Sequence, residues 1–194
     1  MENTSTGKPN SDEMRSQFYL NRLLTDKDCE ANRLPAENVR SVLVVMSATA
    51  MVFDRSALEF HITRAYPNSN VFFMTTSGKF FFPRTPKLPA NNYDLLIDFT
   101  GPRQRQSIFL ARKFRKLARV AVGRNAGMFR KRIYDRVFDD WKAGVMQIQN
   151  RSDRERVAQK EVLKLAGVGF KPVGSLTPDL SKVIASDVSI SGAE

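Results

Sequence analysis

Two acidic residues stand where an α/β enzyme commonly keeps its chemistry, beside the ends of apolar segments. Asp98 closes such a segment and precedes Thr100, and a carboxylate there can act as a general base or bind a hydroxyl group. It can equally pair with Arg103 or cap a following helix. Asp54 stands near the start of a helical pattern, where an acid stabilises the helix N-terminus. Asp54 and Asp98 are therefore the two catalytic candidates, and each has a structural alternative.

The sequence lacks the residue sets that zinc sites, catalytic triads and nucleotide-binding loops require. His61 is the only histidine and Cys29 the only cysteine, so a zinc site or a Ser-His-Asp set has no second member to build on. We expect His61 to pack within a helix. Neither G-x-G-x-x-G nor G-x-x-x-x-G-K-[ST] occurs. We therefore expect no metal and no cofactor, and a single cysteine suits a reducing cytoplasm.

Ligands of open parallel sheets bind at the carboxyl ends of the strands. Three loops qualify: the one after Met46, the segment 98–105, and 123–127. Small hydroxyl residues at the first loop could donate to a ligand, although turn chemistry alone also selects Ser and Thr. The predicted ligand-binding residues are Ser47, Thr49, Thr100, Gly101, Arg103, Arg105 and Arg124.

The positive charge is concentrated in one block. The chain carries a net charge of +11, and no acidic residue lies between Asp98 and Asp135. Such a block attracts phosphate, nucleic acid or anionic lipid, or it forms the solvated face of a helix. The predicted surface for an anionic partner comprises Arg112, Lys113, Arg115, Lys116, Arg130, Lys131 and Arg132.

The elements that must position these residues alternate along the chain. The β-branched run Val42–Met46 is typical of a strand buried on both faces. Segments 71–75, 93–99 and 118–123 predict further strands, separated by helices ending near Tyr66 and running from about Gln104 to Leu117. This order indicates βαβ units. The predicted fold is α/β, a Rossmann-like parallel sheet flanked by helices.

The segments outside this alternation are assigned less structure. We expect disorder over 1–16, an accessory helix and linker over 17–38, the α/β domain over 39–150, a C-terminal helix and linker over 151–180 and a loose tail over 181–194. Helical patterns cover 16–32 and 153–165, and a short helix is expected within 129–140. No apolar leader or spanning segment is evident, so we expect a soluble, cytoplasmic protein, at most peripheral on an inner membrane.

Several motifs follow one another in a fixed order along the chain. The first strand, Val42–Val45, is followed by a helix ending in Thr63-Arg64-Ala65-Tyr66-Pro67. Next come the segment Asn70–Phe73 and the segment from Asn92 to Gly101, which reads NYDLLIDFTG. A strand at Arg119–Gly123 and a helix at Val162–Val168 follow. Together these motifs resemble glycosyltransferase family 9, the bacterial heptosyltransferase-like glycosyltransferases, and the resemblance covers about residues 40–172.

The resemblance implies half of a GT-B arrangement, the N-terminal domain that holds the lipopolysaccharide acceptor. The domain that binds the ADP-heptose donor would follow where this chain ends. The family's catalytic Asp would fall at Ala50–Val52, whereas Asp54 lies two or three positions later. A shift of nearly one helical turn misplaces a base by several ångströms, about 5 Å per turn. Autonomous glycosyl transfer is therefore not expected.

Three functions from different classes fit these observations. The leading hypothesis is an acceptor-type domain that binds an anionic glycan or lipid core, with a separately encoded donor-binding domain as a partner. The alternatives are a basic binding protein for nucleic acid or an anionic membrane surface, and a non-catalytic partner subunit. Nucleic acid is disfavoured because no helix-turn-helix, zinc-finger or RNP-like signature occurs.

Overall fold

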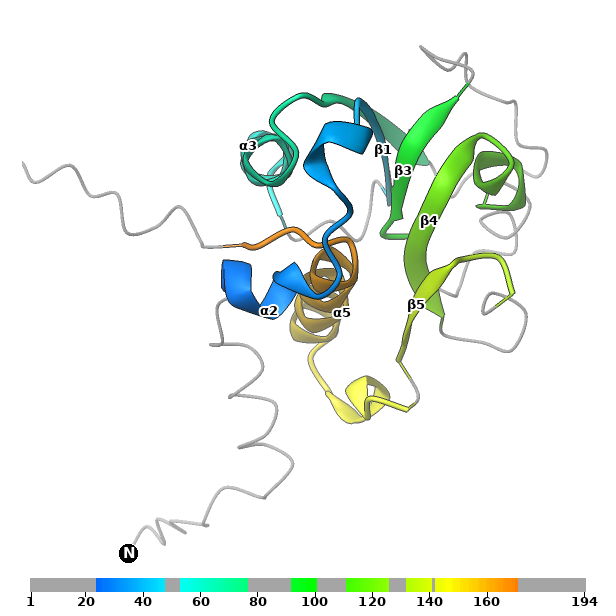
Figure 1. Cartoon of the computed structure of the whole chain (residues 1–194). Coiled ribbons are helices and arrows are strands. Elements are labelled where there is room, and N and C mark those ends of the chain that lie inside the picture. Colours follow the sequence, from blue (N-terminus) through cyan, green and yellow to red (C-terminus); the bar gives the residue numbers. More distant parts are fainter. Residues whose placement is uncertain are drawn as a thin grey trace, which may run out of the picture.

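A computed structural model of the chain describes residues 24–47, 53–76, 92–100, 111–125, 132–140 and 142–170. Figure 1 shows the order of its elements, in which residues 111–115 form one further helical turn. The labelled elements are α2 (Asp26–Glu30), η1 (Ala36–Asn38), β1 (Ser41–Ser47), α3 (Arg55–Ala65), β2 (Asn70–Thr76), β3 (Tyr93–Asp98), β4 (Ala118–Asn125), β5 (Arg136–Asp139), η2 (Val145–Gln147) and α5 (Arg151–Leu165).

The strands form one parallel sheet of five, in the order β2-β1-β3-β4-β5. The interior strand β1 pairs on both sides, with Val44 opposite Phe73 of β2 and Ile97 of β3. A strand with neighbours on both edges and helices on both faces has no polar side, which explains its continuous apolar run. The predicted Rossmann-like α/β fold is confirmed.

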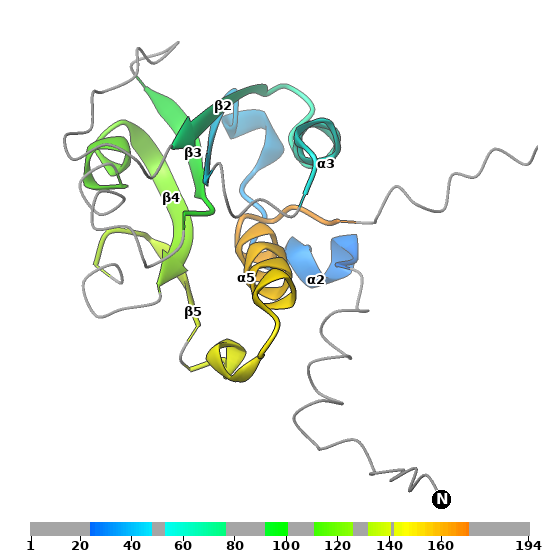
Figure 2. The same cartoon turned by 180° about the vertical axis from the view of Figure 1, so that it is seen from behind.

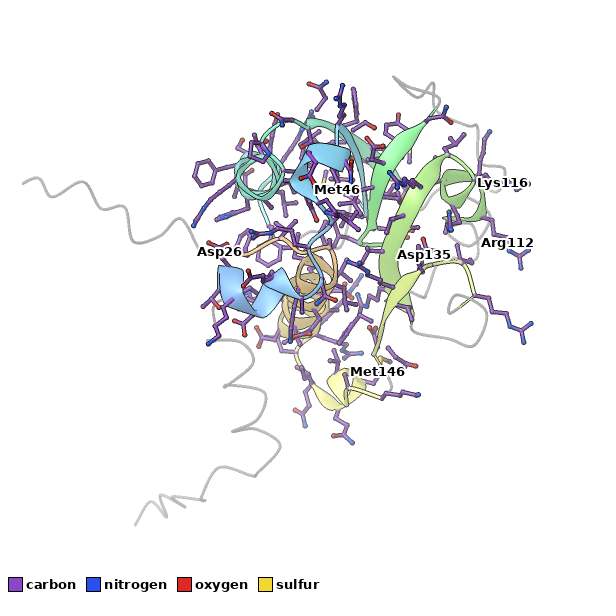
Figure 3. The ribbon with its side chains drawn as sticks, viewed as in Figure 1. Asp26, Met46, Arg112, Lys116, Asp135 and Met146 are labelled. Carbon is purple, nitrogen blue, oxygen red and sulfur yellow. The ribbon has the colours of Figure 1, made fainter. Side chains whose placement is uncertain are left out.

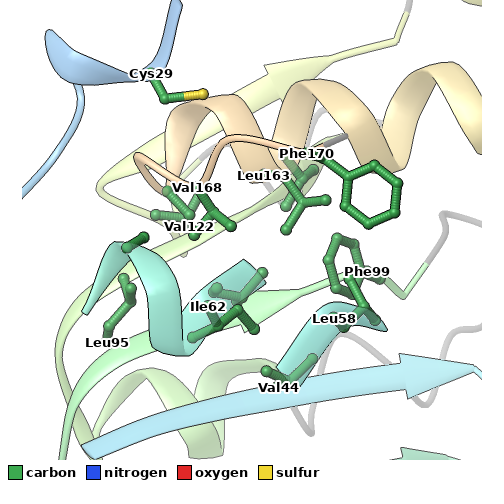
Figure 4. Close-up of a cluster of buried hydrophobic side chains, with 14 of the residues drawn as sticks. Cys29, Val44, Leu58, Ile62, Leu95, Phe99, Val122, Leu163, Val168 and Phe170 are labelled. Carbon is green, nitrogen blue, oxygen red and sulfur yellow. The ribbon is translucent and has the colours of Figure 1, made fainter. Parts of the chain in front are cut away.

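Alternate residues of each strand enter two separate cores. Val42 and Val44 face one core, which contains Leu58 and Ile62 of α3 and Leu163 of α5. Figure 4 shows Val44, Leu58, Ile62 and Leu163 converging there. Leu43 and Val45 face the other core, which is closed by Ala111 and Phe114 of the helical segment 111–115. Helices α2, α3 and α5 thus cover one face of the sheet and segment 111–115 covers the other, as Figures 1 and 2 show.

The C-terminal end of α5 is fastened to distant segments. Gly167 ends the helix with φ +73°, a left-handed conformation that glycine adopts without strain. Tyr66 donates its hydroxyl to the Ala166 carbonyl at 2.6 Å, and Arg136 donates to the carbonyls of Leu165 and Asn32. These donors satisfy carbonyls that a helix leaves unpaired at its end. Helix α5 therefore belongs to the same core as the sheet.

The amino edge of the sheet is held by Asp94. Its Oδ2 accepts hydrogen bonds from the backbone N–H groups of Arg40 and Ser41 at 2.9 and 3.0 Å, and from the Ser41 hydroxyl at 3.0 Å. The Ser41 hydroxyl in turn accepts from the Asp94 N–H. This exchange fixes where β1 begins against β3.

Two predicted helices are wrong in part. Residues 136–139 form the edge strand β5, not a helix; 129–131 lie outside the described residues. The helix expected over 16–32 does not run through its C-terminal half. Leu24 instead pairs with Phe170 in an antiparallel bridge, and Thr25 caps the five-residue helix α2. The Leu24 carbonyl accepts the Phe170 N–H at 3.0 Å, and this bond replaces the one that a continuous helix would make there. Residues 16–23 lie outside the described residues.

Across the part of the chain that the structure describes, no helix combines the length and the apolar character that crossing a bilayer requires.

Candidate functional site

The carboxyl ends of β1 and β3 lie side by side at the centre of the sheet. From β1 the chain crosses by α3 to β2 on one side, and from β3 it crosses by segment 111–115 to β4 on the other. The order therefore reverses between β1 and β3. In doubly wound sheets the connections diverge at this point and leave the crevice where ligands bind. The candidate site is this carboxyl edge.

Only part of the predicted ligand set can be placed at that edge. Ser47 ends β1 and Thr100 follows β3, and both side chains are buried, with 3% and 1% of their surface exposed. Beside Ser47, the hydroxyl of Thr76 donates to the Met46 carbonyl at 3.1 Å. Four predicted residues lie outside the described residues: Thr49, Gly101, Arg103 and Arg105.

Asp98 is buried at the carboxyl edge and accepts three hydrogen bonds. Oδ1 accepts from the Thr100 N–H at 2.8 Å and from the Thr100 hydroxyl at 2.5 Å. Oδ2 accepts from the Tyr134 hydroxyl at 2.5 Å. With 1% of its surface exposed, Asp98 holds the first residues after β3 and the segment before β5. These contacts were named by neither hypothesis from the sequence, and they disfavour a general base, which must reach a substrate proton.

Tyr134 and Gly123 form a second part of this arrangement that the sequence did not suggest. Gly123 lies opposite Asp98 in the ladder of β3 and β4. A Cβ on Gly123 would lie 2.4 Å from Cζ of Tyr134, so the ring occupies the space that any other residue would fill. Glycine at this strand position is the only sequence signal that could have revealed the contact.

Asp54 is the N-cap of α3. Its Oδ2 accepts from the N–H groups of Ser56 at 3.0 Å and Ala57 at 3.4 Å. These are donors that the first turn of a helix leaves without an intrahelical partner. The carboxylate is therefore engaged with its own helix, as the structural alternative from the sequence proposed.

Arg124 is buried rather than presented to a ligand. Its Nε donates to Asp140 at 2.6 Å and one terminal nitrogen donates to Glu155 at 2.5 Å, while 2% of the side chain is exposed. The guanidinium ties β4 to the residue after β5 and to α5. Because Asp140 is fully buried and Glu155 is only 13% exposed, Arg124 is engaged within the fold and is not presented to a ligand, contrary to the prediction.

Burial changes the acid-base chemistry of this cluster. Removal of Asp140 from water raises the pKa of its carboxyl to about 6, and the negative charge of Glu155 adds to the rise, while the Arg124 guanidinium opposes it. Asp140 has none of its surface exposed, and its Oδ1 has no hydrogen-bond partner among the described residues. Neither Asp140 nor Glu155 was singled out from the sequence, since they lie 16 and 31 residues from Arg124.

The predicted surface for an anionic partner is exposed where the structure describes it. Arg112, Lys113, Lys116 and Arg132 are exposed, whereas Arg115 is half-buried. Arg115 donates to Asp135 and to the Ala118 carbonyl, both at 2.8 Å. In Figure 3, Arg112 and Lys116 project away from the sheet. Arg130 and Lys131 lie outside the described residues.

The single histidine and cysteine are both buried. His61 packs against Phe170, with 4.5 Å between ring centroids, and against Phe60 at 5.3 Å. Burial raises the pKa of the Cys29 thiol to about 11, with a further rise from the nearby Asp28 carboxylate, so the thiol stays protonated and unreactive at neutral pH. No group of three His, Cys, Asp or Glu side chains within the described ranges is arranged to hold a metal ion.

Comparison with models of protein families, with curated proteins and with solved structures finds no match for this chain.

Proposed function

We propose that this chain is the acceptor-side domain of a heptosyltransferase-like protein, and that it binds a phosphorylated glycan without transferring a sugar by itself. The observation that carries the proposal is the reversal of strand order between β1 and β3. It places Ser47 and Thr100, after which the segments with the remaining predicted ligand residues begin in the sequence, at one edge of the sheet. The second of these segments contains Arg103 and Arg105, whose guanidinium groups suit a phosphate.

The engagement of both candidate bases supports binding over catalysis. Asp54 caps α3, and Asp98 accepts from Thr100 and Tyr134. A general base must lie within hydrogen-bond reach of the proton that it removes, and both carboxylates already hold donors of their own chain. Sugar transfer would then require groups from a second domain, which a separately encoded donor-binding protein could supply.

A binding experiment with a phosphorylated probe tests this function. Calorimetric titration would compare a deacylated, phosphorylated lipopolysaccharide core oligosaccharide with the same oligosaccharide after phosphatase treatment. We expect binding of the phosphorylated form only. Replacing Arg103 and Arg105 together by Ala should weaken it by roughly a hundredfold or more, because charged hydrogen bonds contribute about 1.5–3 kcal/mol each. The matched control is Arg151→Ala with Arg156→Ala, two exposed arginines of α5.

Two results would contradict the proposal. Equal affinity for the phosphorylated and dephosphorylated oligosaccharides would show that Arg103 and Arg105 do not bind a phosphate group. Tight binding of a radiolabelled nucleotide sugar by the purified chain would show a donor site, which the acceptor-side assignment does not contain.

A further inference from the structure

The exposed charges of the described residues are divided unequally between the two sides of the sheet. On the side covered by segment 111–115, five basic side chains are exposed, and we call them the cationic face: Arg112, Lys113, Lys116, Arg119 and Arg132. Asp135 lies in this layer and is already bonded to Arg115 at 2.8 Å, and Asp139 shares the strand face of Val137. Basic side chains therefore outnumber these acidic ones in this layer.

The opposite layer has no such excess. Acidic and basic residues alternate in α2, where Asp26 lies beside Lys27, and in α5, where Asp153 and Glu161 lie among Arg and Lys residues. Asp26 also forms ion pairs with Arg64 at 2.8 Å and Arg33 at 3.7 Å. Mixed charges of this kind cancel at a distance, so the attraction for an anion comes from the cationic face.

The fold brings the cationic side chains to one side. Arg112 lies in the helical segment and Lys116 directly follows it, four residues on, a spacing that places both on the same side. Figure 3 shows both pointing outward. Arg119 shares the strand face of Ala121, which belongs to the core beneath this segment. Arg132 directly precedes Ile133 and Tyr134, which are buried in that same core.

Four of these cations have no acidic partner in the described part of the chain. Within the described ranges, no Asp or Glu lies within salt-bridge distance of Arg112, Lys116, Arg119 or Arg132. The apolar side of the helical segment is also occupied, since Ala111 and Phe114 have 0% of their surface exposed. The segment can therefore meet a partner by charge but has no free apolar stripe to insert.

We propose that the cationic face docks the protein electrostatically on the anionic surface of a lipid bilayer. A bilayer fits better than nucleic acid for two reasons. Binding of single strands uses exposed aromatic side chains for stacking, and the large exposed apolar side chain of the described residues, Phe60, lies on α3, which covers the opposite face. The sequence also carries no helix-turn-helix or zinc-finger signature, which would place a helix in a duplex groove. The docking is independent of the carboxyl edge.

Vesicle co-sedimentation tests the docking. The full chain would be mixed with vesicles of phosphatidylcholine alone and with vesicles containing 30% phosphatidylglycerol, at 50 and 300 mM NaCl. We expect binding only to the anionic vesicles, and release at the higher salt because screening shortens the reach of the charges. Replacing Arg112 and Lys116 by Gln should weaken binding by about 25-fold, roughly fivefold for each cation near the surface.

A variant with the same loss of charge on the other layer is the control. Lys27→Gln with Arg151→Gln removes two exposed cations from α2 and α5. If the location of the charge determines vesicle affinity, this variant should change binding by less than about twofold. Both double variants should keep the melting temperature of the parent, since all four side chains are exposed. Equal weakening by the two pairs, or duplex DNA binding as tight as vesicle binding at 50 mM NaCl, would overturn the proposal.

Discussion

The hydroxyl of Tyr134 lies 2.5 Å from Oδ2 of Asp98 and joins two segments 36 residues apart. The bond crosses from the end of β3 to the segment that leads into β5, over a glycine of β4. The carboxyl edge is thus built on an internal polar contact, in which Asp98 also accepts two hydrogen bonds from Thr100.

Removal of the Tyr134 hydroxyl should destabilise the fold. Tyr134→Phe leaves the buried Asp98 carboxylate with two donors, both from Thr100. We expect the free energy of unfolding to fall by about 1–3 kcal/mol, the usual effect of removing a donor from a buried charged acceptor. Urea denaturation measures it.

A double-mutant cycle shows whether this loss belongs to the pair. Asp98→Asn and Tyr134→Phe should be strongly non-additive, because each removes the same contact. Additive losses would mean that the two side chains contribute separately and that the bond does not couple the segments.

The positions of Gly167 and Gly144 give a matched pair of substitutions. Both have positive φ, +73° and +68°. A Cβ at Gly167 would lie 2.5 Å from the Arg33 backbone, whereas at Gly144 the nearest atom is 3.7 Å away. Gly144→Ala should cost about 1 kcal/mol of backbone strain. Gly167→Ala should cost clearly more, since Arg33 must move as well. Similar melting temperatures for the two variants would contradict the close approach.

The fold was predictable from the sequence where the local pattern of residues determines secondary structure and burial. Val42–Met46 is apolar throughout because β1 is buried on both faces, and that pattern was recognisable. Strand β5 was missed because it has only four residues and its two ends, Arg136 and Asp139, are charged. An edge strand tolerates charged ends, but such a short segment shows no apolar alternation that would predict a strand. The βαβ pattern predicted a parallel sheet, but it predicted neither the order of the strands nor their register.

The candidate site was less predictable because its contacts are distant in sequence. Arg124 was expected at a ligand on the strength of its charge and its position after a strand. Its true surroundings depend on Asp140 and Glu155, which the fold alone brings to it. An arginine beside a strand end has the same local sequence signal whether it faces a phosphate or a buried carboxylate.

Substitutions of Asp54 separate a helix cap from a catalytic base. Asn caps a helix as well as Asp does, so Asp54→Asn should leave the free energy of unfolding within a few tenths of a kcal/mol. Asp54→Ala removes the acceptor of the Ser56 and Ala57 N–H groups and should cost about 1 kcal/mol. Thermal denaturation measures both. An equal loss in the two variants would show that the charge of Asp54, not its capping oxygen, is what stabilises the fold.

The buried cluster around Arg124 should make stability depend on pH in a characteristic direction. Burial raises the pKa of Asp140 from 3.8 to about 6, so between these values the folded protein holds a proton that the unfolded chain has lost. The contribution is fully present below about pH 3.8 and is lost as the pH rises through about 6. Relative to Asp140→Asn, which does not titrate, the parent should therefore gain stability as the pH falls from 7 to 4. The gain has an upper limit of about 3 kcal/mol, since one pKa unit corresponds to about 1.4 kcal/mol.

The charges that face Asp140 provide the control for that measurement. Arg124 lowers its pKa, and Glu155 and Asp139 raise it. Glu155→Gln removes one of the negative charges, so the gain should begin at a lower pH than in the parent. Urea denaturation at pH 7, 6, 5 and 4 compares the three proteins. If the parent and Asp140→Asn differ by the same free energy at every pH, Asp140 does not take up a proton on folding, and its partnership with Arg124 keeps it ionised throughout.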